Sequence, residues 1–345
     1  MLTAKENMRE VVRGGNPDRH VNQYEAIHIL FHPFTMFSNP MVNKGDMDVV
    51  NPWGVTNSYP ENTPGIFPVH TPDKIVIKDI EHWRDYVKAP PLAFSNEQWD
   101  IARGQLAEVD RDLTYIAPFV FPGFFEQTHH MSEIINALMY YMTNPKDMHE
   151  LIKYLMEWEL ELAEGICTHL KPDALFHHDD WGTENTTFLR PEMFAEFFVE
   201  PYKQVYKYYH DHGVELVIHH NDSYSATLVP YMIEMGIDIW QGCMVSNNVP
   251  ELAKKYGGQI TFMGNIDNKE VDFDGWTQED CLKASYRGCE SIENKHFIPC
   301  ITQGLPGSVY PGTYAGLVEG IDSYNEEKFG IKNPEKARMP LQIFF

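Results

Sequence analysis

The sequence predicts an α/β fold in which helices surround a barrel of parallel strands. Three features of the chain lead to this prediction. Short apolar runs alternate with amphipathic helical segments, and six such units are visible after Leu113. This alternation is typical of parallel sheets, because each crossover lays a helix on a sheet face. The length of 345 residues is common for a single barrel domain. No G-x-G-x-x-G loop follows a strand, which argues against a dinucleotide-binding fold.

The first ninety residues are expected to form an N-terminal extension of short helices, strands and loops. A helix should begin after Thr3, because Thr3 and Glu6 have the spacing of a capping box. From Val21 to about Pro91, short apolar runs are separated by turn-forming residues. We expect residues 91–345 to carry the regular β/α repeats, and residues 1–345 to form a single domain.

The regular part is expected to alternate between strands and helices. A helix over residues 191–213 is indicated by apolar residues at helical spacing, by Pro191 in its first turn and by Gly213 at its C-terminal cap. The other expected helices cover residues 126–142 and 145–170, and the expected strands cover residues 114–121, 174–179, 214–219, 238–242, 260–264 and 296–301.

Composition restricts the kinds of partner. The chain has 50 acidic and 27 basic residues and a net charge of -23, which opposes binding to nucleic acid or to an anionic membrane. A small molecule or a protein partner is expected instead, and a homodimer is left open. The five cysteines form no C-x-x-C pair, and no signal peptide or long apolar run precedes the first helix. A reducing, cytoplasmic location is therefore expected.

Polar side chains gather where the expected strands end, which is where the active site of such a barrel lies. His178 and Asp180 follow one strand and are candidates for orienting the substrate or for acid–base catalysis. An aspartate before Trp-Gly fits a turn and packing element equally well. Glu126 is a third catalytic candidate, although a carboxylate at the start of a helix also favours the helix dipole.

A second group of polar residues follows the strand over residues 214–219. Residues two apart in an extended strand point to the same side, so His220 and Asp222 share one face while His219 and Asn221 take the other. Imidazole nitrogen and carboxylate oxygen both suit zinc, and a catalytic zinc site has about three protein ligands. A hydrogen-bonded pair, or an aspartate that caps the next helix, would show the same pattern, so both interpretations stay open.

Later strand ends supply further candidates. Cys300 ends the strand nearest the C-terminus and is a better metal-ligand candidate than Cys243, although buried cysteines are more often small apolar residues. Asn265 and Gln303 also follow strands, and both are candidates for binding a cofactor.

Several segments of the chain resemble the uroporphyrinogen decarboxylase superfamily. The resemblance spans roughly residues 79–321 and is carried by "DALFHHDDWGTEN", "VIHHNDSYSATLVPYMIEMGIDIWQ" and "GQITFMGNID". Members of this superfamily are (β/α)8 TIM barrels, so the resemblance implies that architecture. The superfamily contains decarboxylases and cobalamin-linked methyltransferases, and its branches differ in their motifs.

The motifs favour the methyltransferase branch. A decarboxylase of the superfamily would carry an arginine-rich N-terminal motif that holds propionates, whereas the corresponding region here reads "YEAIHILFHPFTMF" and has no arginine. The thiol-methylating enzymes carry a zinc motif, His-x-Cys-Gly, at a fixed distance before E-x-G-x-D. The segment "EMGID" places His220 at that histidine and Asp222 at that cysteine. The resemblance therefore implies zinc, with Cys300, Glu184 and His178 as rival third ligands.

The replacement of cysteine by aspartate makes the O-demethylase enzymes look like the most similar branch. A ligand set of imidazole and carboxylate leaves a harder ion that is better matched to oxygen. The resemblance then implies a zinc-dependent methyltransferase that moves methyl from a methoxylated aromatic to the Co(I) corrinoid (cobalamin) of a partner protein. A decarboxylase, methyl transfer to another acceptor, or a barrel that binds a ligand without chemistry are the alternatives.

Overall fold

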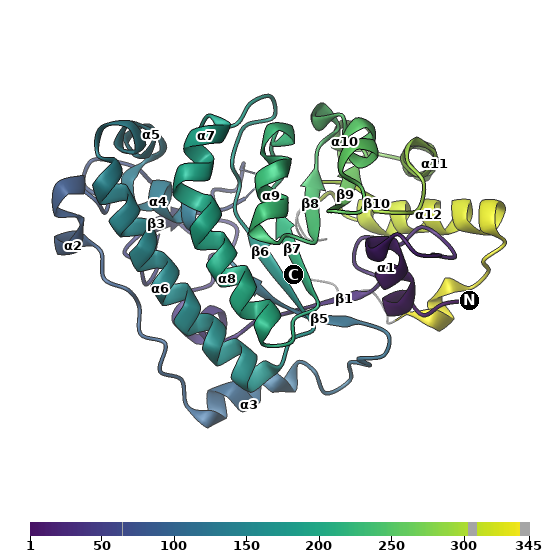
Figure 1. Cartoon of the computed structure of the whole chain (residues 1–345), viewed down its shortest axis with the longest axis horizontal. Helices are drawn as coiled ribbons and strands as arrows, with labels where there is room; N and C mark the ends of the chain where they lie inside the picture. Colours follow the sequence, from purple (N-terminus) through teal and green to yellow (C-terminus); the bar gives the residue numbers. More distant parts are fainter. Residues whose placement is uncertain (64, 303–308, 339–345) are drawn as a thin grey trace.

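Seven parallel strands form the centre of the molecule (Figure 1). The computed structural model describes residues 1–63, 65–302 and 309–338. Each strand of this sheet pairs with its neighbour in the order β1-β5-β6-β7-β8-β9-β10. The strands are β1 (Ile27–Leu30), β5 (Tyr115–Val120), β6 (Ala174–His178), β7 (Leu216–His220), β8 (Ile239–Cys243), β9 (Thr261–Asn265) and β10 (Phe297–Cys300). All six strands predicted after Leu113 are present.

The sheet is curled into a barrel-like shape. Alternate residues of all seven strands point to the same side and meet in one buried apolar cluster, which a flat sheet would not allow. The strands contribute to it Ile27, Ile29, Tyr115, Ala117, Ala174, Phe176, Leu216, Ile218, Ile239, Met263, Ile298 and Cys300. The predicted α/β barrel is confirmed to this extent.

The eight-stranded closure implied by the resemblance is not complete within the described residues, where β1 and β10 are the two edges of the sheet. Helix α1 (Ala4–Arg13) contacts β10 at this place, and the N–H of His296 donates to the carbonyl of Val11 at 2.9 Å. The chain thus brings a helix rather than an eighth strand to the start of β10. The capping box of α1, formed by Thr3 and Glu6, is present as predicted.

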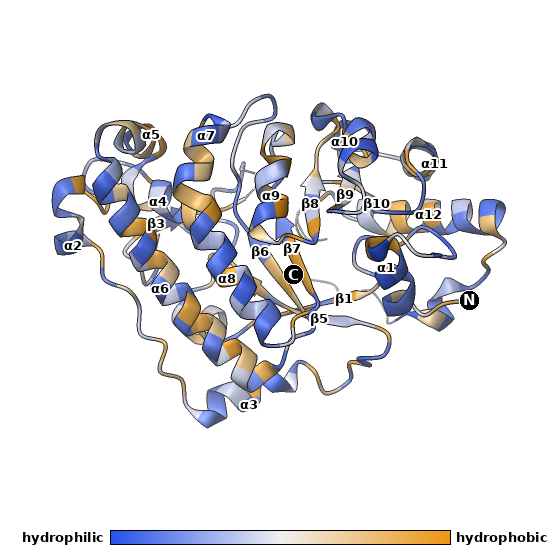
Figure 2. Ribbon diagram, in the orientation of Figure 1, coloured by the Kyte–Doolittle hydropathy of each residue, from blue (hydrophilic) through white to orange (hydrophobic). Residues whose placement is uncertain are grey.

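Helices cover the outer side of the sheet, and Figure 2 shows their mixture of apolar and polar residues beside the apolar strands β6 and β7. The remaining helices are α2 (Trp83–Tyr86), α3 (Asn96–Gly104), α4 (Phe124–Ser132), α5 (Ile134–Thr143), α6 (Pro145–Leu170), α7 (Pro191–Phe194), α8 (Glu200–Asp211), α9 (Val229–Met235), α10 (Val249–Tyr256), α11 (Gln278–Ser291) and α12 (Thr313–Phe329). Short 3-10 or π turns cover Phe34–Ser38, Ile80–His82, Ala195–Val199, Ala226–Leu228, Val245–Asn247, Asn268–Glu270 and Pro334–Ala337. None of the helices described is long and apolar enough to cross a membrane.

Two of the three helices predicted in the regular part are interrupted. The helix predicted over residues 126–142 is two helices, α4 and α5, because Glu133 adopts a φ of 73° and turns the chain. The helix predicted over residues 191–213 contains a π-helical turn between α7 and α8. By contrast, α6 covers the predicted range from Pro145 to Leu170 without a break.

Most of the N-terminal extension belongs to an excursion of the chain between two barrel strands, β1 and β5. Strand β1 lies within residues 1–90 but pairs in parallel with β5. Between them, the chain forms a small antiparallel sheet of β2 (Val49–Val50), β3 (Thr56–Ser58) and β4 (Phe67–Pro68), as well as α2 and α3. The backbone N–H groups of Val76 and Ile77 donate to the carbonyl of Met131, which ties the excursion to α4.

Candidate metal centre

Two histidines lie side by side at the carboxyl ends of neighbouring strands. His178 ends β6, His220 ends β7, and the two residues are paired in register. Each follows an interior residue by two positions, Phe176 on β6 and Ile218 on β7, so both imidazoles continue the inner face of the barrel. Their rings are stacked with centroids 4.4 Å apart. The strand pairing therefore brings together two metal-binding groups that are 42 residues apart in the chain.

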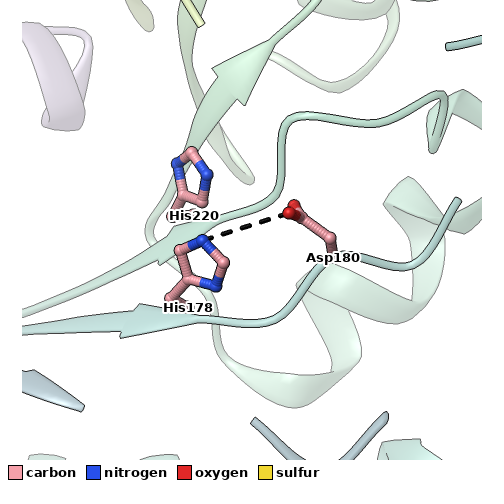
Figure 3. Close-up of side chains that lie close together, drawn as sticks. All are labelled: His178, Asp180 and His220. Carbon is pink, nitrogen blue, oxygen red and sulfur yellow. Dashed lines mark ion pairs between the residues drawn. The ribbon is translucent and has the colours of Figure 1, made fainter. Parts of the chain in front are cut away.

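Asp180 completes a group of three potential metal ligands with these histidines (Figure 3). One ligand atom from each residue lies within 4.8 Å of the others, and His178 Nε2 is 4.0 Å from Asp180 Oδ2. Ligands of a tetrahedral zinc ion are about 3.3 Å apart, since each is about 2.0 Å from the metal. Small side-chain rotations would therefore bring this group to zinc-binding distances. Within the described ranges it is the single group of this kind.

Gln241 orients one of the two histidines and was not recognised from the sequence. The imidazole Nδ1 of His220 forms a short hydrogen bond with the Oε1 of Gln241, which is fully buried on β8. With its Nδ1 donating to this oxygen, His220 presents the lone pair of Nε2 to a metal. Gln241 lies two residues after the interior residue Ile239, and this alternation is the signal by which the sequence could have revealed it.

Glu126 reaches the same group from helix α4. Its Oε2 is 2.9 Å from the Nδ1 of His178. The residue before the helix is Gly123, which has no capping side chain. The carboxylate of Asp179 takes over this role by accepting from the N–H groups of Phe125 (3.0 Å) and Glu126 (2.7 Å). Asp179, which follows β6 and points away from the barrel interior, thus fixes the start of α4 and with it the position of Glu126.

Burial and close charges shift the pKa values of the group. Burial lowers the pKa of His178, but nearby carboxylates, foremost Glu126, raise it to about 10 overall. Burial raises the pKa of the Glu126 carboxyl, and His178 offsets part of this rise. Burial, together with the charge of His178, lowers the pKa of His220 to about 4, so His220 is neutral near pH 7, the form that binds metal. Burial and the charge of Asp180 raise the pKa of the Asp222 carboxyl.

The two residues of the His-x-Asp pattern have different neighbours. His220 belongs to the group of three, whereas Asp222 lies next to Asp180, to which its carboxyl is hydrogen-bonded. The backbone N–H of Asp222 also donates to Asp180 Oδ1 at 2.8 Å. Asp222 therefore adjoins the group of three through Asp180, without belonging to it.

The other candidates from the sequence lie in different surroundings. Glu184 forms an exposed ion pair with Lys269, and the side chain of Asn265 donates to Ser291 Oγ at 3.1 Å. Cys300 is buried among the apolar residues of the barrel interior, where burial raises the pKa of its thiol. Gln303 lies outside the described residues.

The adjacent histidines, His177 and His219, point to the outer side of the sheet. His177 Nε2 is 2.9 Å from Glu159 Oε1 on α6, and His219 Nδ1 is 2.7 Å from the hydroxyl of Tyr206 on α8. Both imidazoles are completely buried between sheet and helices. Their contacts are those of packing residues.

Comparison with known proteins identifies the family. Residues 53–324 match the family described as uroporphyrinogen decarboxylase (URO-D). The chain belongs to the URO-D family. A solved structure described as a methyltransferase from Methanosarcina mazei is similar to this URO-D chain with a TM-score of 0.63 and 12% identity, over 94% of this chain and 99% of that chain. No curated protein matches the chain. The resemblance inferred from the sequence is confirmed, and the solved structure independently supports the fold.

The mouth of this URO-D barrel is suited to a divalent cation. Glu126, Asp180 and Asp222 bring three carboxyl groups to a buried or partly buried region, where His178 is the one imidazole whose pKa is raised. Burial is the main cause of the raised pKa values of the Glu126 and Asp222 carboxyls, and the nearby carboxylates add to it, so the charged forms are not fully compensated there. A bound cation with oxygen and nitrogen ligands would remove this imbalance.

Proposed function

We propose that this chain is a zinc-dependent methyltransferase that moves a methyl group from a methoxylated aromatic to the Co(I) corrinoid of a partner protein. The observation that carries the proposal is the group of His178, Asp180 and His220 at the barrel mouth, with Glu126 behind it. Family membership is consistent with methyl transfer, and the description of the similar Methanosarcina mazei structure as a methyltransferase favours it over decarboxylation.

His178, Asp180 and His220 would hold the zinc ion, with Asp222 as a further oxygen donor beside Asp180. Glu126 fixes His178 through Nδ1, so that Nε2 can bind the metal once it gives up its proton, while Gln241 orients the neutral His220. Such partners behind the ligands fix both rings before the metal binds. Carboxylate ligands also leave the zinc ion harder than thiolates would, and a harder ion is better matched to the ether oxygen of the substrate.

In the proposed reaction, the methyl group passes from the ether oxygen to Co(I), and the electron pair of the broken C–O bond stays on the phenolate oxygen. A free phenol has a pKa of about 10, so this oxygen must be stabilised as it departs. Bound zinc would supply positive charge at that oxygen, an effect of several kcal/mol. The residues of the chain contribute by holding the ligand atoms on rigid strand ends.

Decarboxylation of a tetrapyrrole is the alternative that family membership keeps open. The segment from Tyr24 to Phe37 contains no arginine that could bind several propionates, and bidentate arginine is the usual solution to that problem. The charges that most strongly shift the pKa values of His178 and Asp222 come from carboxylates and imidazole groups. No arginine is among these groups, so they do not supply the bidentate donors that several propionates would need.

The test is to incubate the full chain, loaded with zinc, with a reduced corrinoid protein and a panel of methyl donors. We expect the methylcobalamin spectrum to appear with methoxylated aromatics and to be lost when zinc is removed by a chelator. Methyl transfer that is unchanged in metal-free protein would contradict the role of zinc. Turnover of uroporphyrinogen at an ordinary enzymatic rate, without methyl transfer, would show that the alternative is right.

A further inference from the structure

The mouth of the barrel has a polar half and an aromatic half. Strands β6, β7 and β8 contribute His178, His220 and Gln241, as described above. On the other side of His178, β5 contributes Phe119 and Phe121, which lie at its end and just beyond it. The ring of Phe119 packs against Phe176 of the barrel interior with centroids 5.9 Å apart, so this side chain lies on the inner face.

The aromatic half lies in direct contact with the candidate metal ligands. The rings of Phe121 and His178 are in edge-to-face contact, with centroids 4.9 Å apart and an angle of 89° between their planes. The rings of Phe119 and Phe121 are nearly parallel, at 10°, with centroids 6.1 Å apart. Phe31, which follows β1, extends this surface because its ring meets that of Phe119 at 6.3 Å.

These three phenylalanines are accessible although they border a partly buried group. Phe121 is 44% exposed, and Phe31 and Phe119 are half-buried. Exposed apolar side chains next to convergent polar groups are typical of ligand-binding sites, where the apolar surface takes the body of the ligand and the polar groups fix its orientation. Aromatic side chains prefer ring partners in stacked or edge-to-face contact.

We infer that Phe31, Phe119 and Phe121 bind the aromatic ring of the methyl donor and direct its ether oxygen toward His178 and Asp180. The inference rests on the proposed function, because it assigns a place to the ring of that substrate. The three phenylalanines are positioning residues that select an aromatic over an aliphatic methyl ether.

A neighbouring cavity is too small to bind the aromatic ring of the methyl donor. It is lined by Phe34, Trp53, Trp158 and also by Phe121, and its volume is about 30 Å³. On the same measure one water molecule needs roughly 10–15 Å³, so this cavity has room for about two waters. A benzene ring with a methoxy group has eight heavy atoms and requires the open side of Phe121.

The experiment measures binding of methoxybenzene to the full-length, zinc-loaded protein by calorimetry, with no corrinoid present. We expect Phe119→Ala and Phe121→Ala each to weaken binding about tenfold, because each removes a ring contact and its apolar area. Phe121→Tyr keeps the ring and should bind within about twofold of the unchanged protein. Phe329→Ala is the matched control, since Phe329 is 38% exposed but packs against His20, upstream of β1.

A second ligand separates aromatic recognition from simple apolar burial. Methoxycyclohexane has a similar size but no π face, and we expect it to bind at least fivefold more weakly than methoxybenzene. Equal binding of the two ligands would overturn the inference, as would unchanged affinity in both alanine variants or no binding to the unchanged protein. Thermal melting of each variant shows whether it is folded.

The outcome is independent of the proposed reaction because the binding assay contains no methyl acceptor. Ring binding that depends on Phe119 and Phe121, without methyl transfer to Co(I), would support this inference and contradict the proposed function. Methyl transfer with a KM that neither alanine variant changes would support the function and contradict the inference.

Discussion

At the scale of single residues, the site depends on side chains that stand behind the candidate ligands. His220 is neutral and oriented by Gln241, and His178 is held by Glu126. Partners of this kind fix the tautomer and direction of a metal-binding imidazole, and their loss typically weakens metal binding by ten- to a hundredfold. The importance of Gln241 can therefore be measured without touching a ligand.

We predict that Gln241→Leu weakens zinc binding by roughly ten- to a hundredfold, because the Nδ1 of His220 loses its acceptor. Gln241→Glu retains an oxygen at this place and should bind zinc nearly as well as the unchanged protein. The dissociation constant is measured by competition with a chromophoric chelator. An exposed glutamine, changed in Gln204→Leu, is the control. Equal zinc affinity in Gln241→Leu and the unchanged protein would show that Gln241 does not orient a ligand.

Asp180 and Glu184 are two carboxylates for which the sequence proposed different roles, Asp180 as a catalytic residue and Glu184 as a rival zinc ligand. Asp180→Asn should lower zinc content after dialysis by more than half, because a ligand charge next to His178 is lost. Glu184→Gln should leave zinc content unchanged, since Glu184 is engaged in an exposed ion pair with Lys269. Elemental analysis of the two purified variants gives the answer. The reverse pattern would place the ion near Glu184 and contradict the group of three.

At the scale of secondary-structure elements, the start of α4 determines whether Glu126 reaches His178. Gly123 is the residue before the helix, and its Cα lies so close to Asp179 that an added Cβ would be 2.4 Å from the Cβ of that residue. The same Cβ would be 2.4 Å from the hydroxyl oxygen of Tyr202. Only glycine fits at this junction between β5 and α4 without a shift of the helix.

We predict that Gly123→Ala lowers the free energy of unfolding by about 2–3 kcal/mol, the cost of overpacking a buried site. It should also weaken zinc binding, because Glu126 moves with the helix. Gly104→Ala is the control: no atom lies within 4 Å of an added Cβ, and alanine favours helix. Its stability should be unchanged or rise by up to about 1 kcal/mol. Urea unfolding followed by circular dichroism measures both, and equal stability of the two variants would disprove the packing argument.

At the scale of the whole molecule, buried neutral histidines make the fold sensitive to acid. His20 is packed among the rings of Phe297, Tyr324 and Phe329, and burial lowers its pKa to about 4. In the unfolded chain its pKa is about 6.5, so the unfolded state binds more protons between pH 6.5 and pH 4. The stability linked to His20 is complete above pH 6.5 and is lost as the pH falls toward 4.

Between pH 7 and pH 5 the free energy of unfolding should fall by about 2 kcal/mol less in His20→Phe than in the unchanged protein. This value follows from the pKa of His20 in the folded chain, about 4, and in the unfolded chain, about 6.5. The variant retains an aromatic ring but has no group that titrates in this range. His149→Gln, at an exposed position, is the control and should keep the original pH dependence. Urea unfolding at a series of pH values measures the effect. A parallel pH profile for His20→Phe and the unchanged protein would contradict it.

The repeats and most strands were predictable because they depend on neighbours in the chain. Apolar runs predicted every strand after Leu113, and the helix predicted over residues 145–170 is α6. The break at Glu133 was not predicted, since the apolar pattern continues through it and only its positive φ ends α4. The seven-stranded arrangement of the described residues was also not predictable, because a helix from the other end of the chain contacts β10 at the edge of the sheet.

The sequence by itself determined the family, the parallel strands and the polar character of their carboxyl ends, because each of these depends on residue order within a short window. It also restricted the metal ligands to a few candidates. Only the tertiary structure showed which polar residues lie together: strand register placed His178 beside His220, whereas the paths of the loops brought Asp180, which the sequence proposed as a catalytic residue, to that pair and took Glu184 to Lys269. Contacts between residues far apart in the chain depend on register, twist and loop path, and no local pattern encodes these.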